Sequence, residues 1–196
     1  MAAFLLLAAT AHAAEIDRAA AAMAGTEAQF TQRFTPKGFR TSQVESGSVV
    51  FGSLPMMRWT YARPEAKVFV FDGRKSWFYV PAEKQVTISE LDDQKRSELP
   101  FLMIGDPAAR ERHFAMREAA SGAATVVSLQ PRSPTAMIRN ITVTIAPGTH
   151  LIDRVEYTDR EGNRTTFDFS GYQRRAATAD LFHFTPPAGV EVVQAQ

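Results

Sequence analysis

Cysteine is absent from the 196-residue chain, so it has no disulfide bonds and no thiol nucleophile, and its core must hold it together unaided. A lipid anchor on a processed N-terminal cysteine needs the same residue, so we expect a chain that carries no acyl group itself. Charge of one sign is also lacking: 22 basic and 21 acidic residues give a formal net charge of +1. Without a Lys- or Arg-dense stretch, nucleic acid is not an expected partner.

The first residues have the features of an export signal. Residues 2–9 form a short apolar run, and an Ala-His-Ala triplet ending at residue 13 fits the small-x-small pattern of signal-peptidase sites. The run is too short to cross a bilayer as a helix, which takes roughly 20 apolar residues. A basic segment before it is missing, so Met1 is not expected to be the natural start. We assign 1–13 to a signal-peptide remnant and 14–196 to a single exported domain; the alternative is a buried N-terminal helix.

Hydrophobic periodicity divides the remaining chain into one helix and many short strands. Residues 16–28 are alanine-rich, with apolar positions three and four residues apart, which predicts an amphipathic helix. From residue 29 the period changes to two, and turns with Pro or Gly separate the segments. We expect about ten or eleven strands, at 29–35, 44–52, 57–62, 67–71, 76–80, 85–89, 113–118, 125–130, 138–145, 151–157 and 165–172. Short strands joined by short turns predict an antiparallel meander.

An apolar insertion interrupts the strands between residues 91 and 109. A charged stretch at 92–96 leads into the apolar run 99–104, which proline and glycine bracket, so short helical turns are expected there. Two interpretations remain open: the insertion is a loop that plugs the core, or it is a lid over a cavity. The strands at 68–71 and 77–80 are apolar at successive positions, so a helix or a ligand must cover their second face.

Catalytic motifs are absent from the sequence, which has no G-x-S-x-G, no H-E-x-x-H, no P-loop and no dinucleotide fingerprint. After residue 13 the histidines are His113, His150 and His183, each isolated in sequence from other metal ligands. We therefore expect no enzyme activity, no catalytic residue, no metal and no cofactor. The chain instead has 14 Phe, 7 Met, 4 Tyr and 2 Trp, which suit either a flexible apolar ligand or an ordinary core.

Several segments, in the same order along the chain, resemble motifs of the outer-membrane lipoprotein carrier family, LolA. They are Phe-Thr-Gln at 30–32, Arg-Trp-Thr-Tyr-Ala-Arg-Pro at 58–64, Phe-Asp-Gly at 71–73, Trp-Phe-Tyr-Val-Pro at 77–81, Pro-Phe-Leu-Met-Ile at 100–104 and Phe-His-Phe-Thr-Pro-Pro-Ala-Gly-Val at 182–190. The central three are similar to that family's R-W-x-Y-x-x-P, D-G and W-x-Y-x-P, and the last to its F-x-F-x-P-P-x-G-V ending. Together they span nearly the whole exported chain.

The resemblance implies a mainly β fold: an unclosed half-barrel of antiparallel strands, with short helices as a lid over an apolar cavity. It also implies a periplasmic chaperone, which takes the acyl chains of lipoproteins from an inner-membrane ABC-type release complex to an outer-membrane acceptor. We expect a monomer with a cavity of at least several hundred Å³, as lipid-sized ligands need. The expected lipid-binding residues are Trp59, Tyr61, Phe69, Phe71, Trp77, Tyr79, Leu99, Phe101, Leu102, Met103 and Ile104.

One position departs from the family's pattern. Its best-known members have an arginine before the proline of the turn at 52–55, where it latches the lid, and this chain has Leu54 instead. Leu54 and Arg58 are the candidates for the latch, Arg58 only if its side chain faces the lid. The alternative function is a related periplasmic carrier or sensor for another lipid or glycolipid. A hydrolase whose residues converge only in space, and a purely structural β-domain, are further alternatives.

Overall fold

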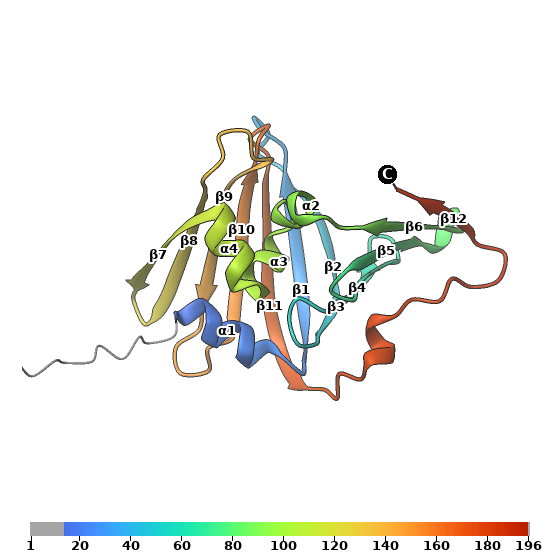
Figure 1. Ribbon diagram of the computed structural model, residues 1–196, viewed down its shortest axis with the longest axis horizontal. Helices are drawn as coiled ribbons and strands as arrows, with labels where there is room; N and C mark the ends of the chain where they lie inside the picture. Colours follow the sequence, from blue (N-terminus) through green and yellow to red (C-terminus); the bar gives the residue numbers. More distant parts are fainter. Residues whose placement is uncertain (1–13, 196) are drawn as a thin grey trace, which may run out of the picture.

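The computed structural model describes residues 14–195, so the predicted signal remnant at 1–13 lies outside the described residues (Figure 1). Its strands are β1 (Thr26–Thr35), β2 (Gln43–Phe51), β3 (Met57–Arg63), β4 (Lys67–Phe71), β5 (Lys75–Val80), β6 (Gln85–Glu90), β7 (Phe114–Ser121), β8 (Ala124–Pro131), β9 (Ile138–Ile145), β10 (Ile152–Asp159), β11 (Arg164–Arg174) and β12 (Glu191–Gln194). The helices are α1 (Glu15–Met23), α2 (Asp93–Ser97), α3 (Pro100–Gly105) and α4 (Pro107–His113), with 3₁₀ turns η1 (Pro81–Glu83) and η2 (Ala179–Phe182).

A single twelve-stranded sheet has the order β12-β6-β5-β4-β3-β2-β1-β11-β10-β9-β8-β7. Two meanders, β1 to β6 and β7 to β11, join where β1 pairs with β11. The order ends on β12 and β7, so the sheet is curved but not closed, and α1 to α4 lie on its concave side (Figure 1). The mainly β, half-barrel fold predicted from the sequence is confirmed.

The twelfth strand is the one that the sequence analysis missed. β12 pairs with β6 in parallel, an exception to the expected antiparallel sheet. Its four residues are too few to show a period, and it reaches β6 only because residues 175–190 first cross the sheet. Because the pairing of β12 with β6 depends on the path of this long connecting segment, no local pattern in the sequence predicts it.

α1 ends earlier than the alanine-rich stretch predicts. Gly25 has φ +69°, a left-handed conformation that favours glycine, and β1 begins directly after it at Thr26. The Thr26 hydroxyl donates to the carbonyl of Met23 at 2.6 Å, which closes the helix end. Within the helix, Ile16, Ala19 and Met23 are buried at 0%, 0% and 1% exposure, as their three- and four-residue spacing predicts.

The convex face of β4 and β5 is covered by another segment of the chain and not by a helix. Val70, Trp77 and Val86 form a separate apolar cluster with Phe184 on the convex side. Phe184 belongs to the extended segment between η2 and β12, which runs across that face of the sheet. The convex-facing apolar residues of these strands therefore pack on this segment, whereas Phe78, on the concave face of β5, remains 40% exposed.

Gly47 in β2 allows aromatic side chains of the two neighbouring strands to meet. It lies opposite Phe30 of β1 and Tyr61 of β3, where a Cβ atom would come within 2.0 Å of the Thr60 carbonyl oxygen. Because no side chain separates them, the rings of Phe30 and Tyr61 are 4.9 Å apart at 76°. The lack of a side chain at Gly47 thus allows aromatic rings of β1 and β3 to form a continuous surface on the concave face.

Gly47→Ala is expected to lower the free energy of unfolding by about 3 kcal/mol, because the new methyl group meets β3 backbone atoms that cannot rotate away. Urea unfolding followed by tryptophan fluorescence measures this. Ser48→Ala, one residue further along β2, is the control and should change stability by about 0.5 kcal/mol or less. A Gly47→Ala variant as stable as the parent would contradict the close approach of β2 and β3.

Candidate functional site

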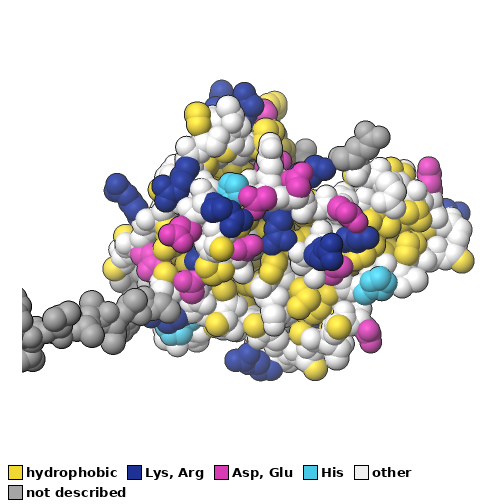
Figure 2. All heavy atoms as spheres, in the orientation of Figure 1, with side chains coloured by type: hydrophobic (Ala, Val, Ile, Leu, Met, Phe, Trp, Pro, Cys, Tyr) yellow, Lys and Arg dark blue, Asp and Glu magenta, His cyan; other side chains and the backbone are white. Residues whose placement is uncertain are grey.

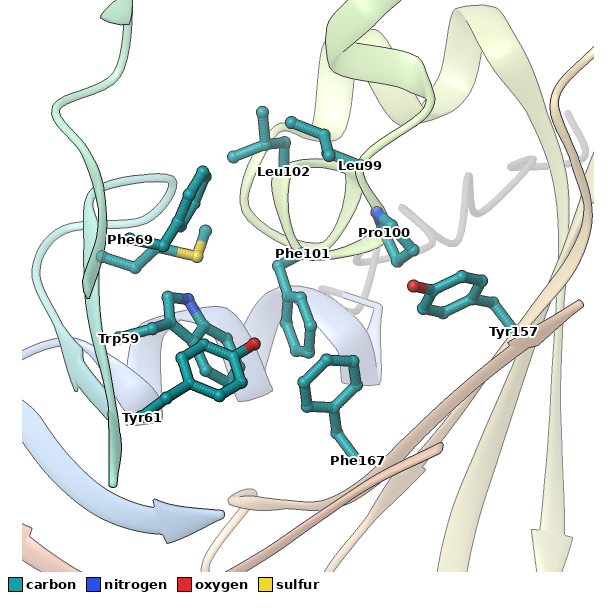
Figure 3. A pocket seen from close by; sticks show the side chains of 10 residues that line it. Trp59, Tyr61, Phe69, Leu99, Pro100, Phe101, Leu102, Tyr157 and Phe167 are labelled. Atoms are coloured by element: carbon teal, nitrogen blue, oxygen red, sulfur yellow. The ribbon is translucent and has the colours of Figure 1, made fainter. Parts of the chain in front are cut away.

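An apolar cavity lies between the concave face of the sheet and α3 (Figure 3). Its lining comes from both meanders and from α3 and the residue before it: Met57, Trp59, Tyr61, Phe69, Leu99, Pro100, Phe101, Leu102, Tyr157 and Phe167. The cavity volume is about 160 Å³, whereas pockets for small molecules hold about 300–1,000 Å³. The prediction of at least several hundred Å³ is therefore not met by this conformation.

Phe101 is the reason for the small volume. Its ring projects from α3 into the centre of the concave face (Figure 3), with ring centroids 4.8 Å from Trp59, 5.0 Å from Phe167 and 6.0 Å from Phe169. The contacts with Phe167 and Phe169 are edge-to-face, an arrangement worth about 0.5–1.5 kcal/mol per pair beyond burial. The insertion at 91–109 thus combines both interpretations from the sequence, since it covers the cavity and its aromatic side chain fills it.

The structure brings six of the predicted lipid-binding residues to this cavity: Trp59, Tyr61, Phe69, Leu99, Phe101 and Leu102. Three others, Phe71, Met103 and Ile104, belong to the adjoining core, where they are at most 1% exposed and do not line the cavity. Met57, Pro100, Tyr157 and Phe167 line it without having been predicted. Phe167 shows the period-two pattern of a strand, but its sequence does not reveal that β11 lies opposite β3.

Trp77 and Tyr79 are on the other face of the sheet, so their prediction as cavity residues is corrected. Phe69 faces the cavity and pairs with Phe78, and Trp77 and Tyr79 flank Phe78 on β5. Because side chains alternate along a strand, both neighbours of Phe78 point to the convex side. There the ring of Trp77 lies 5.5 Å from His183, and that of Tyr79 lies 5.3 Å from Phe184.

The two latch candidates lie on opposite sides of the sheet. Leu54 faces the lid, here defined as α2, α3 and α4, because a Cβ atom at Gly105 would come within 2.5 Å of the Leu54 Cβ. The Arg58 guanidinium donates to the carbonyl of Leu181 at 3.4 Å on the convex side, and burial lowers its pKa. Arg58 therefore does not latch the lid, since the alternation that turns Trp59 inward turns Arg58 outward.

A buried arginine that the sequence analysis did not single out connects the lid to α1. Arg110 in α4 is 4% exposed, and its guanidinium donates to the carbonyls of Met103 at 3.2 Å and Ile104 at 3.0 Å. The same group forms an ion pair with Asp17 of α1. Arg110 thus joins the C-terminal end of α3 to the first helix. In the sequence it is indistinguishable from Arg112, whose side chain is 58% exposed.

The lining of the cavity carries no ionised group. The Tyr61 hydroxyl donates to Gln32 Oε1 at 2.8 Å, and burial, followed by the charge of Glu45, raises the pKa of this phenol far above its usual range. Burial also raises the pKa of Tyr157. Both phenols are therefore neutral at physiological pH, and the cavity favours apolar groups over charged ones.

A second hollow, of about 420 Å³, adjoins the cavity, and Leu99 and Tyr157 line both. We call it the side groove; it lies between α2 and the strands β9 and β10, and its further lining is Ser89, Leu91, Lys95, Glu98, Met137, Ile138, Asp159 and Glu161. Its apolar residues are next to the cavity side chains, and its charged residues reach the surface. Leu99 and Tyr157 therefore lie between the aromatic cavity and the side groove.

Residues 14–195 hold no cluster of three or more His, Asp or Glu side chains placed to bind a metal ion. His113 contacts Asp93 and His150 contacts Glu15, both away from the cavity lining. In the same part of the chain, no helix combines the length and apolar character that crossing a bilayer requires. The site is therefore an uncharged, aromatic cavity beneath the lid, and the buried Arg110 fixes the lid to α1.

An open, curved sheet around such a space defines a binding protein for apolar ligands. The family profile described as "Outer membrane lipoprotein carrier protein LolA" matches residues 21–185, and the chain belongs to this family, as its motifs predicted. An outer-membrane lipoprotein carrier protein from Xanthomonas axonopodis pv. citri is 32% identical over 182 residues, covering 91% of this chain and 86% of that protein. One of the same name from Nitrosospira multiformis is 29% identical over 194 residues, covering 97% and 93%.

A solved structure, of an uncharacterized conserved protein from Thermus thermophilus, has the same fold. It superposes with a TM-score of 0.55 at 15% identity, covering 92% of this chain and 97% of that one. At this identity the likeness concerns the fold alone.

Arg110→Gln is expected to loosen the lid, because it leaves the carbonyls of Met103 and Ile104 and the carboxylate of Asp17 without their partner. The free energy of unfolding should fall by about 2–4 kcal/mol, and amide hydrogen exchange at 102–105 should become faster. Arg112→Gln in the same helix removes an exposed ion pair and should cost about 0–1 kcal/mol. Equal effects of the two substitutions would show that Arg110 does not secure the lid.

Proposed function

We propose that the protein carries lipoproteins through the periplasm by binding their acyl chains on the concave face of the half-barrel. The observation that carries this proposal is the lid side chain Phe101, which occupies an uncharged aromatic cavity as an acyl chain would. Membership of the LolA family and the names of the relatives support the lipoprotein as cargo. The carrier has no catalytic role, takes its cargo from an inner-membrane release complex and passes it to an outer-membrane acceptor.

The energetics of acyl chains require the lid to move. Each CH₂ group transferred to water costs about 0.8 kcal/mol, so a carrier must shield most of both chains of a diacyl anchor. The cavity of about 160 Å³ is far too small for that. Withdrawing α3 would take Phe101 away from the rings of Trp59, Phe167 and Phe169 and open the concave face. It would also displace Leu99, the residue before α3, which lies between the cavity and the side groove. In the empty carrier, the same ring keeps an apolar surface from water and so from aggregation.

We further propose that the lining residues Trp59, Tyr61, Phe69, Leu99, Leu102, Tyr157 and Phe167 contact the acyl chains. Within the lid, α3 moves as a short rigid unit between the breakers Pro100 and Pro107. Leu54 against Gly105 and Arg110 against the α3 carbonyls are the contacts that return it.

Phe101→Asp is expected to abolish acyl-chain binding, because an unpaired charge in an apolar wall is disfavoured by several kcal/mol. The variant should stay folded, since the lid is an insertion outside the sheet, and far-UV circular dichroism checks this. Displacement of a fluorescent fatty-acid probe measures binding, with Phe101→Leu as the control that keeps an apolar side chain. A folded Phe101→Asp protein that binds the probe like the parent would contradict the site.

Native mass spectrometry of protein isolated from the periplasm tests the cargo. The expected adduct has the mass of a lipoprotein, because a covalent diacyl anchor is what the concave face is proposed to hold. A free lipid or glycolipid as the bound species would contradict the lipoprotein assignment while leaving the acyl-chain site intact.

A further inference from the structure

The connection between β1 and β2 carries an aromatic side chain that is mostly exposed to solvent. Phe39 is 66% exposed, the most exposed large hydrophobic side chain of residues 14–195. Val44, at the start of β2, is 52% exposed on the same hairpin. Figure 1 shows this hairpin and the β10–β11 turn projecting together beyond the rest of the molecule, and Figure 2 shows hydrophobic and basic side chains gathered on that projection. We call Lys37, Phe39, Arg40 and Arg164 the basic tip.

The positive charge of the basic tip exceeds the negative charge of the residues beside it. Lower on the same strands, Arg33 and Arg154 both form ion pairs with Asp168. No ion pair of the described residues engages Lys37, Arg40 or Arg164. In residues 159–164, Asp159 and Glu161 offset Arg160 and Arg164 in formal charge, so the excess positive charge of the tip comes from Lys37 and Arg40. The fold therefore neutralises the flank of these strands and leaves the β1–β2 hairpin cationic, with the exposed ring of Phe39 between these two residues in sequence.

Backbone and side-chain hydrogen bonds hold the basic tip in this shape. The Phe39 amide donates to the Pro36 carbonyl at 3.0 Å, and the Lys37 amide donates to Asn163 Oδ1 at 3.0 Å. Asn163 is itself fixed, because its amide donates to Asp159 Oδ1 at 2.8 Å. The hairpin and the turn thus form one support from which Phe39 projects into solvent.

The basic tip stands at the surface end of the side groove. Asp159 and Glu161, which line the groove, belong to the turn that contacts Lys37 through Asn163. The groove begins at Leu99 and Tyr157 beside the aromatic cavity. A surface that touched the tip would therefore lie next to the outer end of the side groove.

We propose that the basic tip binds the surface of an anionic phospholipid bilayer, with Phe39 at the boundary of headgroups and acyl chains and Lys37, Arg40 and Arg164 on the lipid phosphates. An exposed aromatic side chain on a basic hairpin suits this interface, because the ring leaves water and the charges stay with the headgroups. The tip is narrow and convex, and its charge is complementary to an extended anionic surface. With one ring and three cations, binding is weak and reversible, as a shuttle needs. The inference rests on the proposed carrier function. Binding through the tip would place the outer end of the side groove next to the membrane.

Flotation with vesicles of phosphatidylethanolamine and phosphatidylglycerol tests the tip in the empty protein. The parent should bind these vesicles, bind phosphatidylcholine vesicles less, and lose binding as salt increases. Phe39→Ser should weaken binding about tenfold, the lower end of the effect of burying a Phe side chain. Lys37→Gln and Arg40→Gln should each weaken it about fivefold. Val192→Ser, which removes a side chain 47% exposed on β12, and Arg74→Gln, in the β4–β5 turn, are the matched controls and should bind like the parent.

Failure of this proposal is separable from failure of the carrier proposal. Phe39→Ser should bind the fluorescent fatty-acid probe like the parent, and Phe101→Asp should still bind vesicles. A parent protein that does not float with phosphatidylglycerol vesicles, or tip variants that float as well as it does, would overturn the membrane contact. If the tip variants impaired only transfer to envelope fractions that contain protein, the tip would belong to a protein partner and the membrane proposal would fall.

Discussion

The contact of Phe101 with Trp59, Phe167 and Phe169 is the interaction around which the rest of the structure is arranged. The three partners come from β3 and β11, which lie on either side of β1 and β2 in the curved sheet. A flat sheet would leave their rings side by side, whereas curvature turns them toward a common centre. The ring that fills this centre comes from the lid. When the lid closes over the half-barrel, the ring of Phe101 therefore takes the space that a ligand would occupy.

Two features of the sequence make that contact possible without contributing to it directly. Gly47 removes a side chain from the concave face, so the rings on β1 and β3 can meet above β2. Arg110 fixes the end of the helix that delivers Phe101, because its guanidinium satisfies two carbonyls that the short helix leaves without partners. Removing either would disturb the aromatic centre from a distance. Neither position has a chemical role of its own.

The sequence predicted much of the fold because most of its signals are local. Period-two alternation, together with the turns that separate short apolar runs, predicted about ten or eleven strands, and the spacing of Ile16, Ala19 and Met23 predicted the buried face of α1. The site was predicted less completely, because it depends on which face a side chain occupies. In the run 77–80 every position is apolar, so the sequence does not distinguish Trp77 from Phe78, and only pairing with Phe69 places Trp77 outside the cavity. The role of Arg110 likewise appears only when α1, α3 and α4 are packed together.

The closed conformation also explains how a carrier with so apolar an interior could release its cargo. In the proposed function, cargo must displace the ring of Phe101 from three aromatic partners. At about 0.5–1.5 kcal/mol per pair, these contacts lower the net affinity for acyl chains by roughly one to three orders of magnitude. A carrier that bound acyl chains with the full free energy of their burial would keep them. Because the lid competes for the same space, the free energy of binding is reduced to a level that an acceptor of higher affinity can exceed, and transfer then proceeds without chemistry at the carrier.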